Sequence, residues 1–365
     1  MGNSLSTLLL ADVGGQNTLV SGEGLAYLSG ELVYTNHRLL RRAAHLLLHG
    51  QPFFMLSEVD AVNSIASLTH CDAVPNPKLR LSTHCVVLVM ANYKGVPAVL
   101  RVGGCDEARS EVLRQVHGLE IAASDPRLRD LVPHLVALFR GENNREVLIE
   151  SKLPGAPAEF SWERVNAITS FWLEGKPSGN PARPNLSAEL TQLCDSLPSE
   201  RDSLCTLRDP LLEWHSRTRM RADVAHGDLW LGNVLFSGDT VTGIVDWEWA
   251  HADGMRLVDI LHLVFMSYSA FHDISIGSVL RQFWGDAIED PGLKDSLTQL
   301  SMSVGLDQDD LKFAALLLWF DYLRQRVIRG RMPSQAWTED MIPCTAPIIA
   351  KWLTRRTRET LATAT

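Results

Sequence analysis

Residues 224–236 read Val-Ala-His-Gly-Asp-Leu-Trp-Leu-Gly-Asn-Val-Leu-Phe, and residues 243–248 read Gly-Ile-Val-Asp-Trp-Glu. The apolar runs 234–236 and 243–245 flank a polar cluster with a glycine at 237–240, which predicts a hairpin of two short strands. Asp228 and Asn233 lie in the loop that enters the first strand, and Asp246 follows the second strand. The hairpin therefore brings two carboxylates and an amide oxygen close together.

These three side chains point to chemistry on phosphate groups. Oxygen ligands in small number suit Mg²⁺, which keeps some waters and takes further ligands from phosphates. A carboxylate that does not bind the metal can accept the proton of an attacking hydroxyl. The arrangement predicts phosphoryl transfer, and the alternative is a structural hairpin whose acidic residues have no chemical role.

The motif has a known counterpart. His226-x-Asp228-x4-Asn233, followed by Asp246, resembles the catalytic loop and metal-binding aspartate of the aminoglycoside phosphotransferase and choline kinase group, which has the protein-kinase-like fold. Protein kinases have His-Arg-Asp-x4-Asn and then Asp-Phe-Gly. The glycine at 227 and the Asp-Trp-Glu triplet at 246–248 are similar to the small-molecule branch of this fold.

The resemblance implies a role for each motif residue. Asp228 would be the catalytic base for the acceptor hydroxyl. Asn233 and Asp246 would hold Mg²⁺ against the β- and γ-phosphates of ATP. His226 would hydrogen-bond the backbone near Asp246 rather than take part in the chemistry.

Two further acidic residues follow from the same resemblance. Asp259 lies where the family has a Pro-x-x-Asp-Leu-like segment, and we expect it to support the catalytic loop. Glu248 would either assist a second metal or the acceptor, or form a salt bridge.

Composition limits the class of protein. The chain has 365 residues, 45% of them hydrophobic, which suffices for one large or two moderate globular domains. Its net charge of −9 lacks the basic surface of a nucleic-acid-binding protein. Most of the excess negative charge lies in residues 151–365, where it would attract a cationic acceptor such as an amino sugar or a choline-like amine.

Cysteine use and hydropathy bear on location. The six cysteines form no C-x-x-C pair and no metal-ligand spacing, so we expect reduced thiols in a cytoplasmic protein. No apolar run is long enough to span a bilayer as an integral membrane segment. The sequence identifies no protein partner.

A small sheet is expected before the motif. The run 85–90, a turn at 92–95 and the run 96–102 predict a hairpin, and 145–150 predicts a further strand. Arg101 falls where protein kinases have the lysine that grips the α/β-phosphates; the alternative is an exposed arginine on an edge strand, because Pro97 is typical of edges. A helix from Asp106 to near Gly118 would supply its carboxylate partner. Glu107 and Glu111 lie on one face of this helix, so either could reach inward, and the family resemblance favours Glu111.

The nucleotide side departs from the kinase pattern at one point. No glycine occurs between residues 70 and 84, where a loop should cover the phosphates, so that contact would fall to the hydroxyls of Ser82 and Thr83 or to nearby cations. The resemblance places the interlobe hinge at 150–152, with backbone groups of Glu150 to Lys152 on the adenine edge.

The remaining pattern is mainly helical. Helices are expected at 161–174, 187–195, 200–219, 255–270 and 311–329, with a final helix near the C-terminus, and a basic amphipathic helix over 35–49. We therefore predict an α+β, two-lobed protein-kinase-like fold. It would have an N-terminal extension (1–60), a small antiparallel-sheet lobe that binds the nucleotide (61–150) and a larger, mainly helical lobe for catalysis and acceptor binding (151–365).

The resemblance implies an ATP- and Mg²⁺-dependent phosphotransferase that acts on a hydroxyl of a small molecule, such as an amino sugar or antibiotic, a choline-like amine or a sugar. The alternative is a catalytically idle pseudokinase that serves as a binding or regulatory module, which the missing glycine-rich loop favours. The intact Asp228, Asn233 and Asp246 argue against that alternative.

Overall fold

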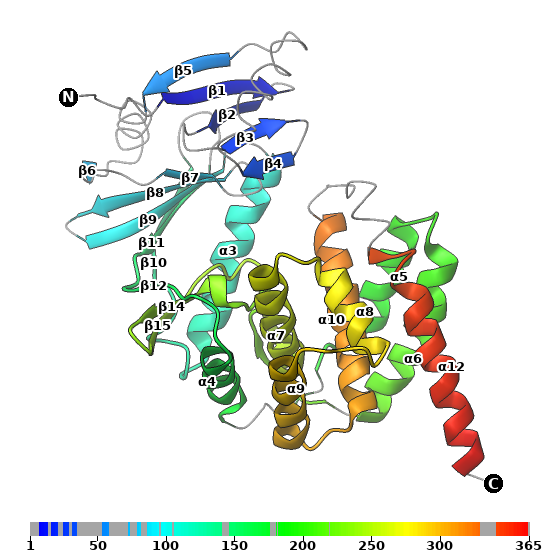
Figure 1. Cartoon of the computed structure of the whole chain (residues 1–365). Helices are drawn as coiled ribbons and strands as arrows, with labels where there is room; N and C mark the ends of the chain where they lie inside the picture. The colour runs from blue at the N-terminus through cyan, green and yellow to red at the C-terminus, as the bar shows by residue number, and fades with distance from the viewer. Residues whose placement is uncertain are drawn as a thin grey trace. The chain divides into compact units, whose positions relative to one another are not determined.

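A computed structural model of the chain divides into two compact units, Met1–Leu153 and Pro154–Thr365. It describes residues 7–13, 16–20, 25–28, 31–34, 53–57, 72–73, 79–81, 86–94, 96–103, 106–140, 146–175, 180, 182–218, 220–328 and 341–363. The basic helix expected at 35–49, the hydroxyls of Ser82 and Thr83 and most of the glycine-free segment lie outside the described residues. Figure 1 shows the elements of both units.

The first unit is built on an antiparallel sheet. Its strands are β6 (Asp72–Ala73), β7 (Leu79–Leu81), β8 (Val86–Tyr93), β9 (Val96–Gly103), β10 (Leu135–Arg140) and β11 (Glu146–Ser151), in the order β10-β11-β9-β8-β6 with β7 also on β8. The expected hairpin is confirmed, since Tyr93 pairs with Val96 at its turn. The edge-strand alternative for Arg101 is wrong, because β9 lies between β8 and β11.

The helix after β9 is longer than the sequence suggested. It was expected to end near Gly118, but α3 runs over Asp106–Ser124. The apolar pattern continues beyond the glycine, with Leu119 and Ala122 buried. A single glycine in a helix costs only about 1 kcal/mol relative to alanine, so burial of the next turn outweighs it.

Short strands also occur nearer the N-terminus, where we predicted no strands from the sequence. β1 (Thr7–Val13) pairs with β2 (Gln16–Val20) and with β5 (Phe53–Ser57), and β3 (Leu25–Leu28) pairs with β4 (Glu31–Tyr34). All of these pairs are antiparallel.

The second unit is mainly helical, as expected (Figure 1). Its described helices are α4 (Trp162–Leu173), α5 (Leu186–Ser196), α6 (Arg201–Thr218), α7 (Arg256–His272), α8 (Ile276–Trp284), α9 (Pro291–Val304), α10 (Gln308–Ile328) and α12 (Ala346–Thr363). N-cap side chains stabilise the first turn of some of these helices. The Ser161 side chain accepts a hydrogen bond from Arg164 N at the start of α4, and the Asp290 side chain accepts one from Leu293 N at the start of α9. None of the described helices is long and apolar enough to cross a bilayer.

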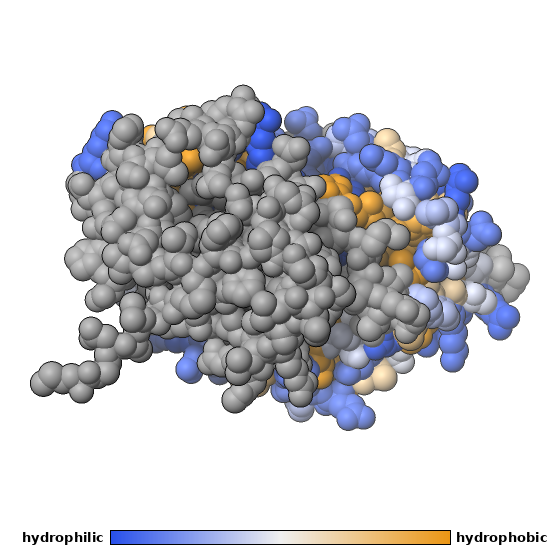
Figure 2. Space-filling view, turned by 90° about the horizontal axis from the view of Figure 1, so that it is seen from above, coloured by the Kyte–Doolittle hydropathy of each residue, from blue (hydrophilic) through white to orange (hydrophobic). Residues whose placement is uncertain are grey.

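Helices α7 and α10 form the centre of this unit. Twelve residues of α7 and twelve of α10 are buried, including Trp319 and Phe320. Large aromatic side chains fill the space around them, among them the fully buried Trp214, Trp247 and Trp284. In Figure 2 hydrophilic side chains form much of the visible outline of the described residues, with a hydrophobic area among them. The packed helices give the second unit a rigid frame for the loops between them.

Those loops carry the short strands of the second unit. β14 (Val234–Ser237) lies between β12 (Ala156–Pro157) and β15 (Thr240–Ile244), and β13 (Asp223–Ala225) pairs with β16 (His251–Gly254). A single turn of 3₁₀ helix, η2 (Leu231–Asn233), leads into β14. The hairpin predicted around residues 237–240 is thus present as β14 and β15.

Candidate active site

The β14–β15 hairpin places Asn233 next to the segment that carries Asp246. Val234 pairs with Ile244 in the ladder, and Val245 N donates to Asn233 O at 2.9 Å. Asp246 follows directly and has a φ of 71°, in the left-handed region that non-glycine residues seldom adopt. Such conformations concentrate at functional sites, where the surrounding structure compensates for them.

The side chain of Asn233 also contacts Asp228. The Asn233 Nδ2 donates to Asp228 O at 2.9 Å and to Asp228 Oδ2 at 3.4 Å. Asn233 is buried, whereas the Asp228 side chain keeps 25% of its surface exposed. Because the amide nitrogen of Asn233 faces Asp228, its Oδ1 is the atom left to bind a cation, and the Asp228 carboxylate can meet a substrate.

His226 connects the two acidic segments. Its Nε2 lies 3.0 Å from Val245 O, immediately before Asp246, and its Nδ1 accepts from Asp228 N at 3.2 Å. This is the backbone hydrogen bond expected from the sequence. Burial lowers the pKa of His226 to about 4, so the ring is neutral at pH 7. The neutral ring with its proton on Nε2 satisfies both contacts.

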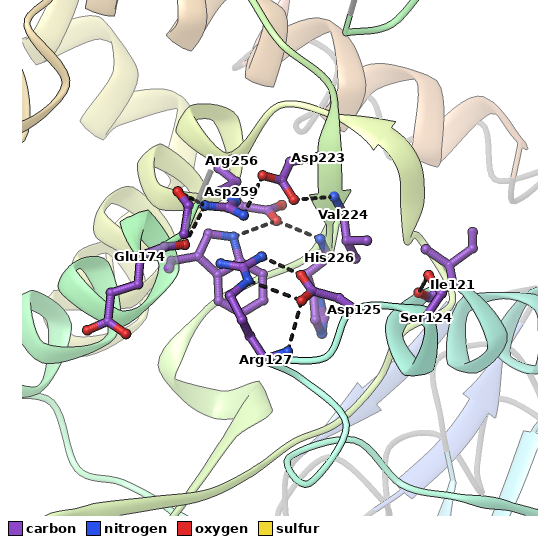
Figure 3. A network of polar contacts seen from close by, with 12 residues as sticks. Ile121, Ser124, Asp125, Arg127, Glu174, Asp223, Val224, His226, Arg256 and Asp259 are labelled. Carbon is purple, nitrogen blue, oxygen red and sulfur yellow. Dashed lines mark hydrogen bonds and ion pairs between the residues drawn. The ribbon is translucent and has the colours of Figure 1, made fainter. Parts of the chain in front are cut away.

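Asp259 of α7 supports the loop that leads to Asp228, the structural role expected of it (Figure 3). Its Oδ2 accepts from His226 N and from Trp172 Nε1, and its Oδ1 accepts from Gly227 N at 2.8 Å. Burial raises the pKa of this carboxyl to about 7, against the effect of these donors. In the same view Arg256 lies between Asp223 and the backbone carbonyl of Glu174.

Position 227 accommodates only glycine. Its φ is 77°, and a Cβ at this position would lie 2.1 Å from Trp249 O. The departure from the protein-kinase arginine at this position therefore has a local steric cause. Glu248, two residues after Asp246, is buried and accepts from Trp249 Nε1 at 2.9 Å.

Two residues that the sequence did not reveal also contact the loop. His262 Nδ1 lies 2.9 Å from Leu229 O, and its Nε2 lies 3.6 Å from Asp228 Oδ1. Gln325 Nε2 donates to Gly227 O at 2.8 Å. His262 follows Asp259 by three residues on α7 and so shares its helix face, a signal that could have identified it. No local signal marks Gln325.

Asp321 of α10 has a buried partner. Arg183 contacts it with Nη1 at 2.9 Å and Nη2 at 3.0 Å, and Arg183 also pairs with Glu189 of α5. Arg183 holds the pKa of the Asp321 carboxyl below its usual value despite burial. The pair ties the segment before α5 to α10.

In the first unit Arg101 is buried and forms an ion pair. Its Nε lies 3.0 Å from Glu150 Oε1, and Gln115 Nε2 donates to Glu150 Oε2 at 3.0 Å. We had assigned Glu111 as the partner; Glu111 is buried on α3. Arg101 pairs with Leu148 in the β9–β11 ladder, so Glu150, two residues further, points to the same face of the sheet. Register thus gives Arg101 a strand carboxylate that the sequence analysis missed.

Two backbone N–H groups of the predicted hinge at 150–152 already donate hydrogen bonds within the first unit. Ser151 N donates to His134 O at 2.9 Å, and Lys152 N donates to Pro97 O at 3.0 Å. These two N–H groups already have backbone acceptors. Any adenine contact at this segment would therefore use carbonyl groups or a donor other than these two.

The oxygen donors of the hairpin fit Mg²⁺. Among the described residues no three His, Cys, Asp or Glu side chains gather into a metal site. Asn233 Oδ1 and the Asp246 carboxylate would supply two hard oxygen ligands, and Mg²⁺ completes such a shell with water and phosphate oxygens. This donor set suits an ion that arrives with a nucleotide.

Part of the chain is similar to known phosphotransferases. Residues 111–291 match the model of the phosphotransferase enzyme family. A homoserine kinase of Nitrobacter hamburgensis is 34% identical over 104 residues, which are 28% of this chain and 28% of that protein. The match thus spans little more than a quarter of that relative.

Solved structures show the same fold. The crystal structure of the aminoglycoside phosphotransferase APH(4)-Ia aligns over 79% of this chain and 99% of its own, with a TM-score of 0.53 and 13% identity. A thermostable mutant of that enzyme, in a ternary complex with ADP and hygromycin B, aligns over 78% and 97% with a TM-score of 0.52 and 12% identity. This chain is therefore related through residues 111–291 to the phosphotransferase enzyme family, and it has the α+β, protein-kinase-like fold of the aminoglycoside phosphotransferases.

Proposed function

We propose that this chain transfers the γ-phosphate of ATP, with Mg²⁺, to a hydroxyl group of a small molecule. The observation that carries the proposal is the position of the Asp228 carboxylate. It is partly exposed on a loop whose backbone N–H groups are held by the Asp259 carboxylate, and it lies beside Asn233. Phosphoryl transfer depends mostly on positioning and charge neutralisation, and this loop supplies the first of these.

Each residue has a defined task in this proposal. Asp228 accepts the proton of the acceptor hydroxyl, which contributes about 10²–10⁴-fold to the rate. Asn233 Oδ1 and Asp246 hold Mg²⁺, which neutralises the charge that develops on the β- and γ-phosphates. In the first unit Arg101, held by Glu150, would offer phosphate a forked cation.

The acceptor is proposed to carry an amine as well as its hydroxyl. Homoserine and aminoglycosides, after which the relatives are named, are both hydroxylated amines. The negative charge of residues 151–365 would attract such a cation. We also propose that the protein acts in the cytoplasm, where ATP is available and thiols stay reduced.

The test is calorimetry of ATP binding with and without Mg²⁺, followed by phosphate transfer to a panel of homoserine, choline, kanamycin, hygromycin B and neutral sugars. We expect Mg²⁺-dependent binding and transfer to an aminated member. Binding without transfer to any acceptor or to water would favour the pseudokinase alternative. Absence of nucleotide binding would overturn the proposal.

A further inference from the structure

The peptide group that joins Gly227 to Asp228 is held at both of its polar atoms. Its carbonyl oxygen accepts from Gln325 Nε2 at 2.8 Å, and its N–H, on Asp228, donates to His226 Nδ1 at 3.2 Å. A peptide group is planar, so two hydrogen bonds on its opposite sides fix the orientation of the plane. That plane sets the direction in which the Asp228 side chain leaves the backbone.

Gly227, which supplies the carbonyl of this peptide, restricts its own backbone torsions very little. Gly227 lacks a Cβ and adopts a φ of 77°, and glycine has more accessible backbone conformations than any other residue. Its N–H is fixed by Asp259 Oδ1 at 2.8 Å. Of the two hydrogen bonds described on the 227–228 peptide, loss of Gln325 would leave the longer one, from Asp228 N to His226 Nδ1 at 3.2 Å, because Asp259 contacts the two preceding peptides.

Gln325 is well placed to supply this constraint. It is buried, with 8% of its surface exposed, and lies on α10 between buried neighbours such as Leu323. One turn earlier on the same helix, Asp321 forms its two-pronged contact with Arg183. Gly227, His262, Asp321 and Gln325 line one small cavity.

We propose that Gln325 is a positioning residue for Asp228: its amide holds the Gly227 carbonyl from α10 and so sets the orientation of the catalytic carboxylate. Its effect on turnover rests on the proposed function, whereas its effect on the loop does not. The group required is a hydrogen-bond donor. Methionine has the volume of glutamine without the donor, and glutamate has its shape with acceptors only.

Hydrogen exchange tests the effect on the loop directly. We would compare the full-length wild type with Gln325→Met and Gln325→Glu at pH 7.5 and follow the peptide that covers 224–236. A net hydrogen bond of about 1 kcal/mol predicts about five-fold faster exchange of this segment in both variants. Unchanged exchange in a folded variant would overturn the proposal.

The control removes a similar hydrogen bond elsewhere in the same unit. Ser296 Oγ of α9 donates to Asn166 Oδ1 of α4 at 3.1 Å, and neither residue contacts the catalytic loop in a hydrogen bond shown by the structure. Ser296→Ala should lower thermal stability about as much as Gln325→Met without faster exchange at 224–236. Equal acceleration by Ser296→Ala would mean general loosening and would overturn the specific role of Gln325.

Turnover supplies the second readout. With Mg-ATP and the best acceptor of the panel, or water, kcat of both Gln325 variants should fall about 10- to 100-fold, since misplacement of a catalytic group by about 1 Å costs up to that much. The KM for ATP should stay within about two-fold of wild type. An unchanged kcat would overturn the proposal. A wild type that forms no ADP would defeat the proposed function alone, and the exchange data would still decide the role of Gln325.

Discussion

At the scale of single residues, Asp228 is the group whose loss should affect chemistry alone. Asp228→Asn keeps the shape of the side chain and can still meet Asn233, but it cannot take a proton. We expect kcat to fall about 10²–10⁴-fold, with Mg-ATP affinity and melting temperature close to wild type. Steady-state kinetics and calorimetry on the same preparation check this, and normal turnover would remove Asp228 from the mechanism.

Replacement of Asp246 should weaken metal binding. Asp246→Ala removes one of the two proposed ligands, so we expect the Mg²⁺-dependent part of ATP affinity to disappear, while metal-independent binding remains. A titration of ATP at several Mg²⁺ concentrations measures the difference. The matched control is Asp239→Ala, a fully exposed acid at the turn of the same hairpin. Undiminished Mg²⁺ dependence would show that the metal is held elsewhere.

The two ring nitrogens of His262 have different surroundings. Nδ1 must carry the proton, because the carbonyl of Leu229 can only accept; Nε2 is then unprotonated and donates no hydrogen bond to Asp228 Oδ1, 3.6 Å away. His262→Asn keeps a donor near the Nδ1 position, whereas His262→Gln places its amide near Nε2. We therefore expect Asn to retain more kcat than Gln, about ten-fold, if anchoring of Leu229 is the main task. Kinetics of the two variants, with melting temperatures as a check on folding, decide the order; the reverse order would contradict this assignment.

At the scale of elements, the Arg183–Asp321 pair fastens the segment before α5 to α10. Arg183 has a φ of 48° and is almost fully buried, and Glu189 and Asp321 both contact its guanidinium. Arg183→Ala would leave the buried Asp321 without this partner, and breaking a buried pair in this way costs about 3–5 kcal/mol.

Urea unfolding measures this loss. The matched control is Arg201→Ala, whose partner Asp195 is exposed, as Arg201 itself is, so that the expected loss is below about 1 kcal/mol. Arg183→Lys should recover part of the stability, because a lysine keeps the charge but cannot make the two-pronged contact. Equal losses for Arg183→Ala and Arg201→Ala would show that the buried pair contributes nothing special.

The same elements show what sequence alone could predict. The hairpin followed from local spacing, because its strands pair with near neighbours in the sequence, and the supporting role of Asp259 followed from the family resemblance of this segment. Gln325 and Arg183 did not follow, since their partners lie 98 and 138 residues away and depend on how α10 packs. Glu150 was missed for a similar reason: its side chain meets Arg101 through strand register, which the sequence of either strand does not specify.

The extent of α3 is a failure of another kind. A glycine such as Gly118 is typical of a helix end, yet burial of the following turn extends the helix to Ser124. Tertiary packing outweighs a local signal of about 1 kcal/mol. Local patterns thus identified the types of most elements in the second unit and set their ends less well.

At the scale of the whole molecule, the buried histidines of the second unit should make stability depend on pH. Burial lowers the pKa values of His226, His251 and His262 to about 4, while burial raises that of Asp259 to about 7. Unfolded histidines bind protons near pH 6.5 and unfolded aspartate near 3.9. Between about pH 6 and 4.5 the unfolded chain therefore holds three protons at these histidines, whereas the folded chain holds one, at Asp259, which it binds already near pH 7.

The net difference of two protons sets the sign and the size of the effect. The free energy of unfolding should fall as pH falls through this window, by about 1.4 kcal/mol per pH unit for each net proton. Since domains have only about 5–15 kcal/mol of stability, the urea midpoint should drop steeply before pH 5. Urea titrations at half-unit steps from pH 7.5 to 4.5 measure the slope. His262→Gln removes one of the three histidines and should reduce the slope by about half, whereas replacement of the exposed His272 on the same helix should leave it unchanged. A flat profile, or an equal slope in His262→Gln, would mean that these rings are not held neutral by the fold.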